Sequence, residues 1–348
     1  MIRNVHDEQQ HANDDPHVGL ILALTINGLA VSDYREMVRV AHVAERYRFD
    51  SIWTCDHFLT LSPDDYVKDA GIDRNDTPNN SDDRRRSMPL LEGWTALAAL
   101  ARDTTTLRLG TSVLCNSYRY PSVLAKMAAT LDVISEGRLD LGIGAGWFQQ
   151  EFNAYGIPFP SVGDRVSALA ESLDVIKAVW TQRNPTYSGR FYSLDGAVCD
   201  PPPLQAPHPP LWVGGEGDRV QRIAARSAQG LNIRWWSPEK VQSRKEFVKQ
   251  ACSAAGREPE TLRLSLTALL APTECAAQEK QIRAEFASIP ETGLIVGPID
   301  KCVDRINAYR RSGIDHFLFT IPHVAHSEYL ATVGESLIPL LKSPISVG

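Results

Sequence analysis

The sequence predicts an α/β fold, specifically a (β/α)₈ TIM barrel with insertion loops, from three observations. Eight short apolar segments typical of strands begin near residues 18, 50, 107, 138, 211, 230, 262 and 315. Helical patterns lie between them, and eight strand–helix units are the signature of a barrel. The 348 residues, less a tail and two insertions, leave about one barrel of ~250 residues. The alternative is a doubly wound sheet, which usually has fewer strands, and no GxGxxG turn follows the first segment.

Each element follows from its local pattern. The run VGLILAL (18–24) is continuously apolar, as expected for a strand buried on both faces, and FDSIWT (49–54) is a second strand. Between them, from Asp33, apolar residues recur at helical spacing. The further predicted strands are 107–114, 138–144, 210–215, 230–235, 262–270 and 314–321. The further predicted helices are 94–102, 121–135, 164–181, 218–228, 238–255, 299–312 and 333–342.

Two stretches with little periodicity interrupt the pattern and are interpreted as insertions. They are residues 57–91 and 182–209 of a single domain that covers 18–348, preceded by a disordered tail at 1–17. The first insertion follows the second strand and would therefore lie at the C-terminal face of the barrel, where barrel enzymes place their active sites. It is either a mobile lid or a passive disordered loop.

Composition excludes several classes of function. With 36 basic and 42 acidic residues the chain has a net charge of −6, which is unlike a nucleic-acid-binding surface. No apolar run reaches the roughly 18 residues of a membrane span, and the N-terminus is too polar for a secretory signal. The six cysteines are scattered and contain no CxxC pair. We therefore expect a cytoplasmic protein with reduced thiols and no membrane or nucleic-acid partner.

Polar residues follow the second and third predicted strands. Asp56 and His57 stand after strand two, where a histidine is suited either to proton transfer or to a structural bond with the loop backbone. No metal-ligand spacing is present there. After strand three, hydrogen-bonding side chains, aromatic rings and one cation follow in Thr111, Ser112, Asn116, Tyr118 and Arg119. Arg119 either holds an anionic ligand or bridges neighbouring loops.

Glycine-rich turns follow two further strands. Gly142, Gly144 and Gly146 permit either close approach to a flat ligand or a tight strand-to-helix turn. Trp147 is then placed to stack on a ring or to seal the barrel. The segment VGGEGDRVQR (213–222) ends a strand and opens a helix, which suits a phosphate, although Glu216 and Asp218 argue against a large polyphosphate.

These motifs together resemble the bacterial-luciferase-like superfamily of flavin- and deazaflavin-dependent oxidoreductases. The resemblance rests on SIWTCDHF (51–58), MPLLEGW through GIPFP (88–160) and PPLWVGGEGDRVQRIAARSAQGLNI (209–233), in this order, and spans roughly residues 18–320. Within the superfamily, DHF together with LGTSVL and RYP is most similar to the branch that uses coenzyme F-420, a deazaflavin hydride carrier. The family fold is itself a (β/α)₈ barrel.

The resemblance implies roles for individual residues. His57 is the implied catalytic proton donor, and the Ser112–Val113 peptide is expected to be a cis bulge against the cofactor ring. The implied cofactor-binding residues are Asp56, Thr111, Ser112, Val113, Cys115, Asn116, Ala145, Gly146, Gly215, Glu216, Gly217 and Arg219. Trp147 and Tyr118 are expected in the substrate pocket.

One position departs from the family pattern. Sugar-phosphate dehydrogenases of the deazaflavin branch carry a catalytic glutamate directly after the GxG of strand four, where this chain has Trp147. An apolar or aromatic substrate is therefore favoured over glucose 6-phosphate. The next carboxylate, Glu151, lies about one helical turn further on and receives no role at this stage.

Three hypotheses follow. The first is a coenzyme F-420-dependent oxidoreductase that transfers hydride to or from a small organic substrate, with His57 managing the proton. The second is an FMN-dependent monooxygenase that uses reduced flavin and O₂, with a flavin reductase as partner. The third is a cofactor-free binding protein on a retained barrel. Similar proteins are commonly dimers, so a homodimer is expected.

Overall fold

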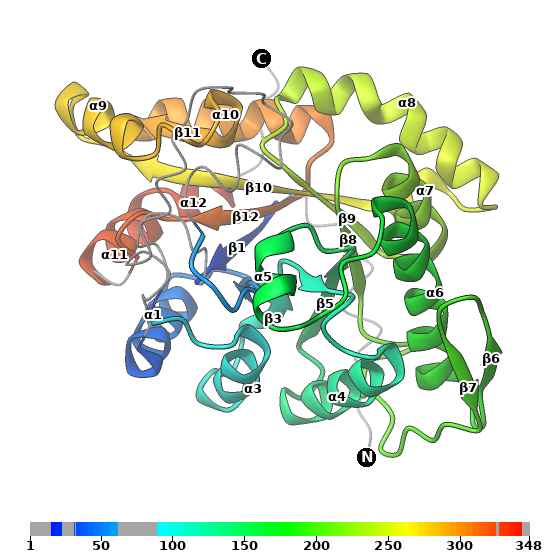
Figure 1. Cartoon of the computed structure of the whole chain (residues 1–348). Helices are drawn as coiled ribbons and strands as arrows, with labels where there is room; N and C mark the ends of the chain where they lie inside the picture. The colour runs from blue at the N-terminus through cyan, green and yellow to red at the C-terminus, as the bar shows by residue number, and fades with distance from the viewer. Residues whose placement is uncertain (1–14, 23–30, 32, 62–88, 325–326, 343–348) are drawn as a thin grey trace.

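Eight parallel strands form a closed ring in the computed structural model of the chain (Figure 1). Each strand pairs with the next, β10 pairs with both β9 and β12, and β12 pairs with β1 to close the ring. The structure describes residues 15–22, 31, 33–61, 89–324 and 327–342. In ring order the strands are β1 His17–Ile21, β2 Ser51–Thr54, β3 Arg108–Thr111, β5 Leu139–Gly144, β8 Leu211–Gly214, β9 Gly230–Arg234, β10 Arg263–Pro272 and β12 His316–Thr320. The predicted barrel is confirmed.

Helices surround the ring, and their first residues follow the capping preferences of the sequence. The side chains of Asp33, Glu92, Ser161 and Ser237 accept backbone N–H groups at four helix starts. Pro121 opens α4, where its missing N–H costs nothing. The helices that follow the ring strands are α1 Tyr34–Arg46, α3 Gly93–Asp103, α4 Pro121–Ile134, α6 Val162–Thr181, α7 Asp218–Ser227, α8 Pro238–Ala254, α10 Ile299–Ser312 and α11 Ser327–Ser336.

The main hydrophobic core lies between the strands and this layer of helices. The residues of β5 and β12 are all buried, as expected for strands covered on both faces. The apolar side of α1 contributes Met37, Val40 and Ala41 to the same core. The core thereby holds each strand in place, and the loops at the strand ends are positioned on a rigid frame.

Several elements were not expected from the sequence. They are β4 Leu114–Cys115, the hairpin of β6 Thr186–Ser188 and β7 Ser193–Asp195, the short helices α5 Gln149–Ala154 and α9 Ala276–Glu285, and β11 Leu294–Gly297, which pairs with β10 outside the ring. These segments are short, and most of them do not span enough residues to show a period. The helix predicted at 333–342 is two helices, because α11 ends at Ser336 and α12 spans Ile338–Leu341.

One predicted boundary is corrected, and parts of the predicted tail and of the first insertion are not described by the structure. His17, assigned to the tail, is the first residue of β1 and pairs with His316, so the barrel begins one residue earlier than expected. Residues 1–14 of the predicted tail, and 62–88 of the first insertion, lie outside the described residues. Within the described part of the chain, no helix has the length and apolarity needed to cross a membrane.

Candidate active site

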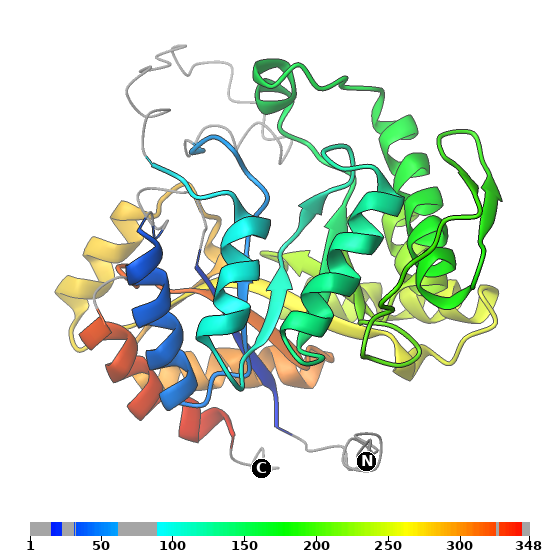
Figure 2. The same ribbon diagram turned by 90° about the horizontal axis from the view of Figure 1, so that it is seen from below.

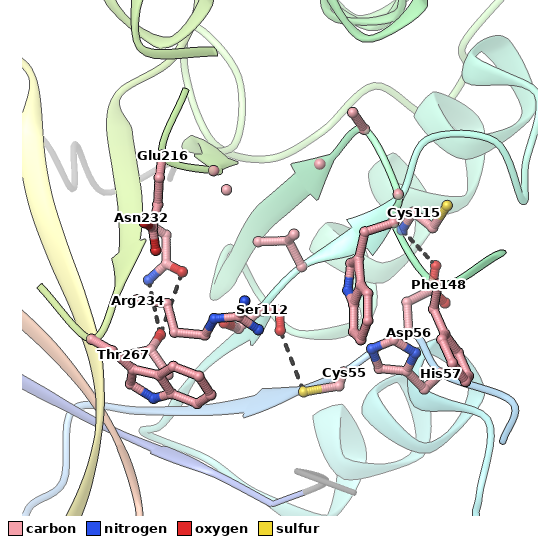
Figure 3. A pocket seen from close by; sticks show the side chains of 18 of the residues that line it. Cys55, Asp56, His57, Ser112, Cys115, Phe148, Glu216, Asn232, Arg234 and Thr267 are labelled. Atoms are coloured by element: carbon pink, nitrogen blue, oxygen red, sulfur yellow. Dashed lines mark hydrogen bonds between the residues drawn. The ribbon is translucent and has the colours of Figure 1, made fainter. Parts of the chain in front are cut away.

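A cavity of about 600 Å³ opens where the ring strands end (Figure 3). Its walls come from residues at or after the C-terminal ends of β2, β3, β4, β5, β8, β9 and β12 and from the middle of β10. Turned by 90°, the barrel shows these strand ends and the short helix α5 on the same side (Figure 2). The cavity therefore occupies the position where barrel enzymes carry out their chemistry.

His57 is held at the edge of this cavity by a buried carboxylate. Its Nδ1 lies 3.0 Å from Oε2 of Glu151, whose side chain is fully buried. The ring meets Trp147 edge-on at 5.8 Å and Phe148 at 6.2 Å between centroids. The His57 side chain keeps 17% of its surface exposed, so it is fixed in orientation and still reachable from the cavity.

Glu151 is ionised, and each of its two carboxylate oxygens accepts hydrogen bonds from two donors. Its Oε1 accepts the backbone N–H groups of Phe58 and Leu59 at 2.5 and 2.9 Å, and the hydroxyl of Tyr118 donates to Oε2 at 2.6 Å. Burial tends to raise the pKa of Glu151, but the bonds from His57, Tyr118 and Leu59 outweigh it and lower the pKa. Burial and the bond to Glu151 raise the pKa of Tyr118, which stays protonated as a donor.

This arrangement fixes which nitrogen of His57 carries hydrogen. Because an ionised carboxylate only accepts, Nδ1 of His57 donates to Glu151. In the neutral ring Nε2 is then an acceptor, and in the protonated ring it is a donor. His57 can therefore take or give a proton through Nε2, while Glu151 holds the ring by Nδ1.

Asp56 carries an unsatisfied polar atom beside His57. Its Oδ2 accepts the backbone N–H of Cys115 and the guanidinium of Arg119, both at 2.8 Å, whereas the buried Oδ1 has no hydrogen-bond partner. Burial raises the pKa of Asp56, and Arg119 opposes this effect only in part. Arg119 also binds Glu92 at 2.5 Å, so of its two predicted roles the bridge between loops is confirmed.

The peptide between Ser112 and Val113 is cis, as the resemblance implied. The Val113 side chain lies against two glycines of neighbouring strands: a Cβ on Gly144 or Gly214 would stand 2.9 or 2.8 Å from its methyl carbon Cγ2. Any side chain at these glycines would push Val113 out of place. One wall of the cavity is consequently built of backbone and small side chains, which suits a flat ring.

The turn after β8 forms the next part of the wall. Gly215 has a φ of +145°, and α7 begins directly afterwards with Gly217 as its N-cap. The N-terminus of a helix is a favourable place for a phosphate. Glu216 lines the cavity and lies 3.6 Å from Nζ of Lys240, so a cation partly offsets its negative charge.

Most of the predicted site residues line this one cavity, and four do not. Those that line it are Asp56, His57, Ser112, Val113, Cys115, Tyr118, Ala145, Gly146, Trp147, Gly215 and Glu216. Those outside the lining are Thr111, Asn116, Gly217 and Arg219, and their predicted role in cofactor binding stays a prediction.

Each of these four residues makes a different contact in the structure. The buried hydroxyl of Thr111 donates to the carbonyl of Gly142 at 2.7 Å and joins β3 to β5. Asn116 turns to the hydroxyl of Tyr192 in the second insertion, at 3.0 Å. Arg219 reaches Ser167 Oγ on α6 at 2.9 Å. Gly217 serves as the helix cap.

The cysteines that line the cavity do not account for chemistry at this site. Burial raises the pKa of both Cys55 and Cys115 to about 12, so these thiols are neutral and weakly nucleophilic at ordinary pH. Among the residues that the structure describes, no group of three or more His, Cys, Asp or Glu side chains is placed to hold a metal ion.

The sequence reasoning missed several residues of the site. Glu151 receives no role from the sequence, because the family's catalytic glutamate stands at the position that Trp147 occupies in this chain. In the structure Glu151 binds His57, which is 94 residues away in the sequence. Arg234, Trp235, Lys240 and Ile289 also line the cavity. Their place in the sequence was the available signal. Arg234 and Trp235 lie at the end of the predicted strand 230–235, and His57 follows another predicted strand.

A closed barrel of eight parallel strands with a cavity over its strand ends has the architecture of barrel enzymes. Residues 10–290 match the family described as luciferase-like monooxygenase, and the chain belongs to this family. The resemblance inferred from the motifs is thereby confirmed.

Two relatives and one solved structure are similar to this chain over most of its length. The chain is 25% identical over 341 residues to an F420-dependent glucose-6-phosphate dehydrogenase of Amycolatopsis mediterranei (strain U-32), covering 89% of this chain and 95% of that one. It is 28% identical over 339 residues to the protein of the same name from Microbacterium testaceum (strain StLB037), covering 88% and 93%. A solved F420-dependent secondary alcohol dehydrogenase, in complex with an F420-acetone adduct, has the same fold at a TM-score of 0.74 and 19% identity, covering 94% and 100%.

Proposed function

We propose that this protein is a coenzyme F-420-dependent oxidoreductase that transfers hydride to or from a small organic substrate. The observation that carries the proposal is the His57–Glu151 couple at the edge of a glycine-lined cavity. The names of the curated relatives, which are F420-dependent dehydrogenases, support the choice of cofactor.

The residues present fit a deazaflavin. The wall formed by Val113, Gly144 and Gly214 leaves a face without long side chains, and Asp56 Oδ1 is a buried polar atom without a protein partner. Gly215, Glu216 and the start of α7 would lie near the phosphate. When bound, coenzyme F-420 supplies or accepts a hydride at C5 of its ring.

The protein's own contribution is to handle the proton and to exclude water. His57 would exchange the proton of the substrate through Nε2, with Nδ1 held by Glu151. Trp147 and Phe148 shield this histidine with aromatic rings on the cavity side. The Asp56–Arg119 pair keeps charges balanced next to the site.

An FMN-dependent monooxygenase is the second candidate, because the family description names that activity. A glycine-lined wall and a water-excluding aromatic cover would serve reduced FMN and O₂ equally well. This function would require a flavin reductase as partner. In either case we expect a homodimer.

Equilibrium binding separates these functions. Purified protein is titrated by calorimetry with coenzyme F-420, oxidised FMN and, without oxygen, reduced FMN. Micromolar or tighter binding of F-420 together with weak binding of both FMN forms is the expected result. Preferential binding of reduced FMN would overturn the proposal in favour of the monooxygenase, and binding of none of them would favour a cofactor-free protein.

A further inference from the structure

The cavity has two walls of opposite character. Gly144, Ala145, Gly214 and Gly215 form the small-residue wall that suits a cofactor ring. The other wall is apolar and bulky, and it consists of Trp147, Phe148, Trp235, Leu269, Ile289 and Pro290. If the proposed function is right and the first wall holds the cofactor, the second wall faces the substrate.

This apolar wall is built in advance. Phe148, Leu269 and Ile289 of this wall belong to a hydrophobic cluster separate from the barrel core. The buried members of this cluster are Leu61, Phe148, Leu269, Ala271, Phe286, Ile289, Leu294 and Val296. Trp147 and Trp235 pack against this cluster while remaining partly exposed to the cavity. A cluster of this size holds the two indoles in position without a ligand.

The backbone conformation of Trp235 and the space left by Gly293 fix the position of its indole. Its backbone φ is +59°, a left-handed conformation that a bulky side chain rarely adopts. A Cβ at Gly293 would stand 2.4 Å from Cδ1 of Trp235, so the absence of a side chain at Gly293 makes room for the indole. Unusual backbone conformations of this kind persist where the surroundings enforce them, and they cluster at ligand sites.

Two cationic residues of the described part of the chain line the cavity, and the guanidinium carbon of Arg234 lies 4.6 Å from the centroid of the Trp235 ring. Lys240 pairs with Glu216 at 3.6 Å and covers the ring of Trp236. The Arg234 side chain reaches into the cavity toward Ser112 (Figure 3). The apolar wall itself contains no charged side chain among the described lining residues. Indole and aliphatic groups form this wall, so an apolar substrate body gains free energy by burying its surface there.

We infer that the substrate is a largely apolar molecule with a flat body and one conjugated carbonyl or C=C group. The body would lie against Trp147 and Trp235, and the reactive group would lie near Nε2 of His57. In the reducing direction, a hydride with its two electrons passes from reduced coenzyme F-420 to the β-carbon of an enone. His57 supplies the proton that completes the saturated ketone, and the cofactor leaves oxidised. This inference rests on the proposed function.

The test compares two probes on F-420-loaded protein. Benzylideneacetone is a flat, uncharged aromatic enone, and glucose 6-phosphate is a polar anion. Calorimetry is expected to detect benzylideneacetone and to find glucose 6-phosphate at least roughly tenfold weaker, because only the first buries apolar surface against the indoles. Equal or tighter binding of glucose 6-phosphate would overturn the inference.

Variants locate the binding site. Trp147→Ala and Trp235→Ala should each weaken benzylideneacetone roughly tenfold or more, and the Phe substitutions should restore part of the affinity. Tyr187→Ala, in the hairpin strand β6 and outside the cavity lining, is the aromatic control and should change nothing. Unchanged affinity in both tryptophan variants would contradict the inference.

Failure of the proposed function gives a different result. If the protein binds no F-420 but binds benzylideneacetone in a manner that depends on Trp235, the apolar substrate wall stands and the cofactor assignment falls. If F-420 binds and benzylideneacetone does not, the cofactor assignment stands and the substrate class falls. The F-420 affinity of each variant also reports whether the variant has folded.

Discussion

The two ends of the barrel each hold histidines, but in opposite environments. At the N-terminal end, His316 is buried and its ring lies 4.1 Å from that of His17 and 4.4 Å from that of Trp212. The His17 and His316 rings bond to Ser51 and Ser265 at 2.8 and 2.9 Å. At the C-terminal end, His57 faces a cavity and bonds to an ionised carboxylate instead of a hydroxyl.

The electrostatic consequences differ accordingly. Burial, followed by the charges of nearby groups including Arg263 and Arg108, lowers the pKa of both His17 and His316 well below the usual value, so both rings stay neutral. His57 instead has Glu151 beside it, whose pKa is lowered so that a negative charge is present to receive an imidazolium. The same side chain therefore serves packing at one end and is suited to proton transfer at the other.

The largest expected effect is the removal of His57. His57→Ala should reduce turnover roughly 10²- to 10⁴-fold, the usual contribution of a positioned acid or base, while F-420 binds as in the wild type. Steady-state kinetics and calorimetry measure the two quantities. His42→Ala, at a histidine that bonds to the carbonyl of Asp103 outside the cavity, is the control with wild-type turnover. Wild-type turnover in His57→Ala would remove this histidine from the mechanism.

A smaller effect is expected from the partner of His57. In Glu151→Gln, the amide oxygen still accepts from Phe58 and Leu59, so the amide NH₂ faces His57 and forces its hydrogen to Nε2. We expect turnover to fall roughly 10- to 100-fold with a changed pH profile. ¹⁵N NMR of labelled histidine measures the tautomer directly.

Tyr118→Phe is the matched control for Glu151→Gln. It removes one donor to Glu151 but leaves the carboxylate in place, so the hydrogen should stay on Nδ1 of His57. If the NMR signal of His57 showed the same tautomer in the wild type and in Glu151→Gln, the orienting role of Glu151 would be wrong.

The smallest expected effect concerns the histidines at the opposite end. Because the folded-state pKa values of His17 and His316 are lowered, the unfolded chain binds more protons below pH ~6.5, and stability falls as the pH decreases. The loss approaches about 1 kcal/mol per pH unit for each histidine. Glu45, Glu92 and Glu151 have lowered pKa values and add their losses mainly below pH ~4.5.

Urea unfolding between pH 7 and 5 isolates this contribution. The free energy of unfolding should decrease across this window in the wild type, and the decrease should be smaller in His17→Gln, which removes one of the two titrating rings. A variant with the wild-type slope would contradict the assignment.

The sequence predicted the parts of the molecule that depend on local pattern. All eight ring strands, and the position of His57 at a strand end, follow from apolar periodicity and from the rule that barrel sites lie at the C-terminal face. The cis Ser112–Val113 peptide followed from the family resemblance. Contacts between distant segments were missed, because Glu151 and Trp235 acquire their roles only when the ring closes.

The predicted site residues that lie outside the cavity lining have a related explanation. Thr111 and Asn116 stand in the right segment, but a sequence does not show which neighbour a polar side chain will choose. Thr111 is the last residue of β3 and bonds to β5, whereas Ser112 and Val113 leave the strand and reach the cavity. Asn116 bonds to an insertion whose position was unknown from pattern alone.

The most direct test of the account is a crystal structure of the protein with coenzyme F-420. The account predicts the deazaflavin ring in the cavity, against Val113 and the glycines that support it, with Nε2 of His57 facing the reaction side and Nδ1 still bound to Glu151. A ring bound elsewhere on the molecule, or a cavity in which His57 has left Glu151 and points away from the ring, would contradict it.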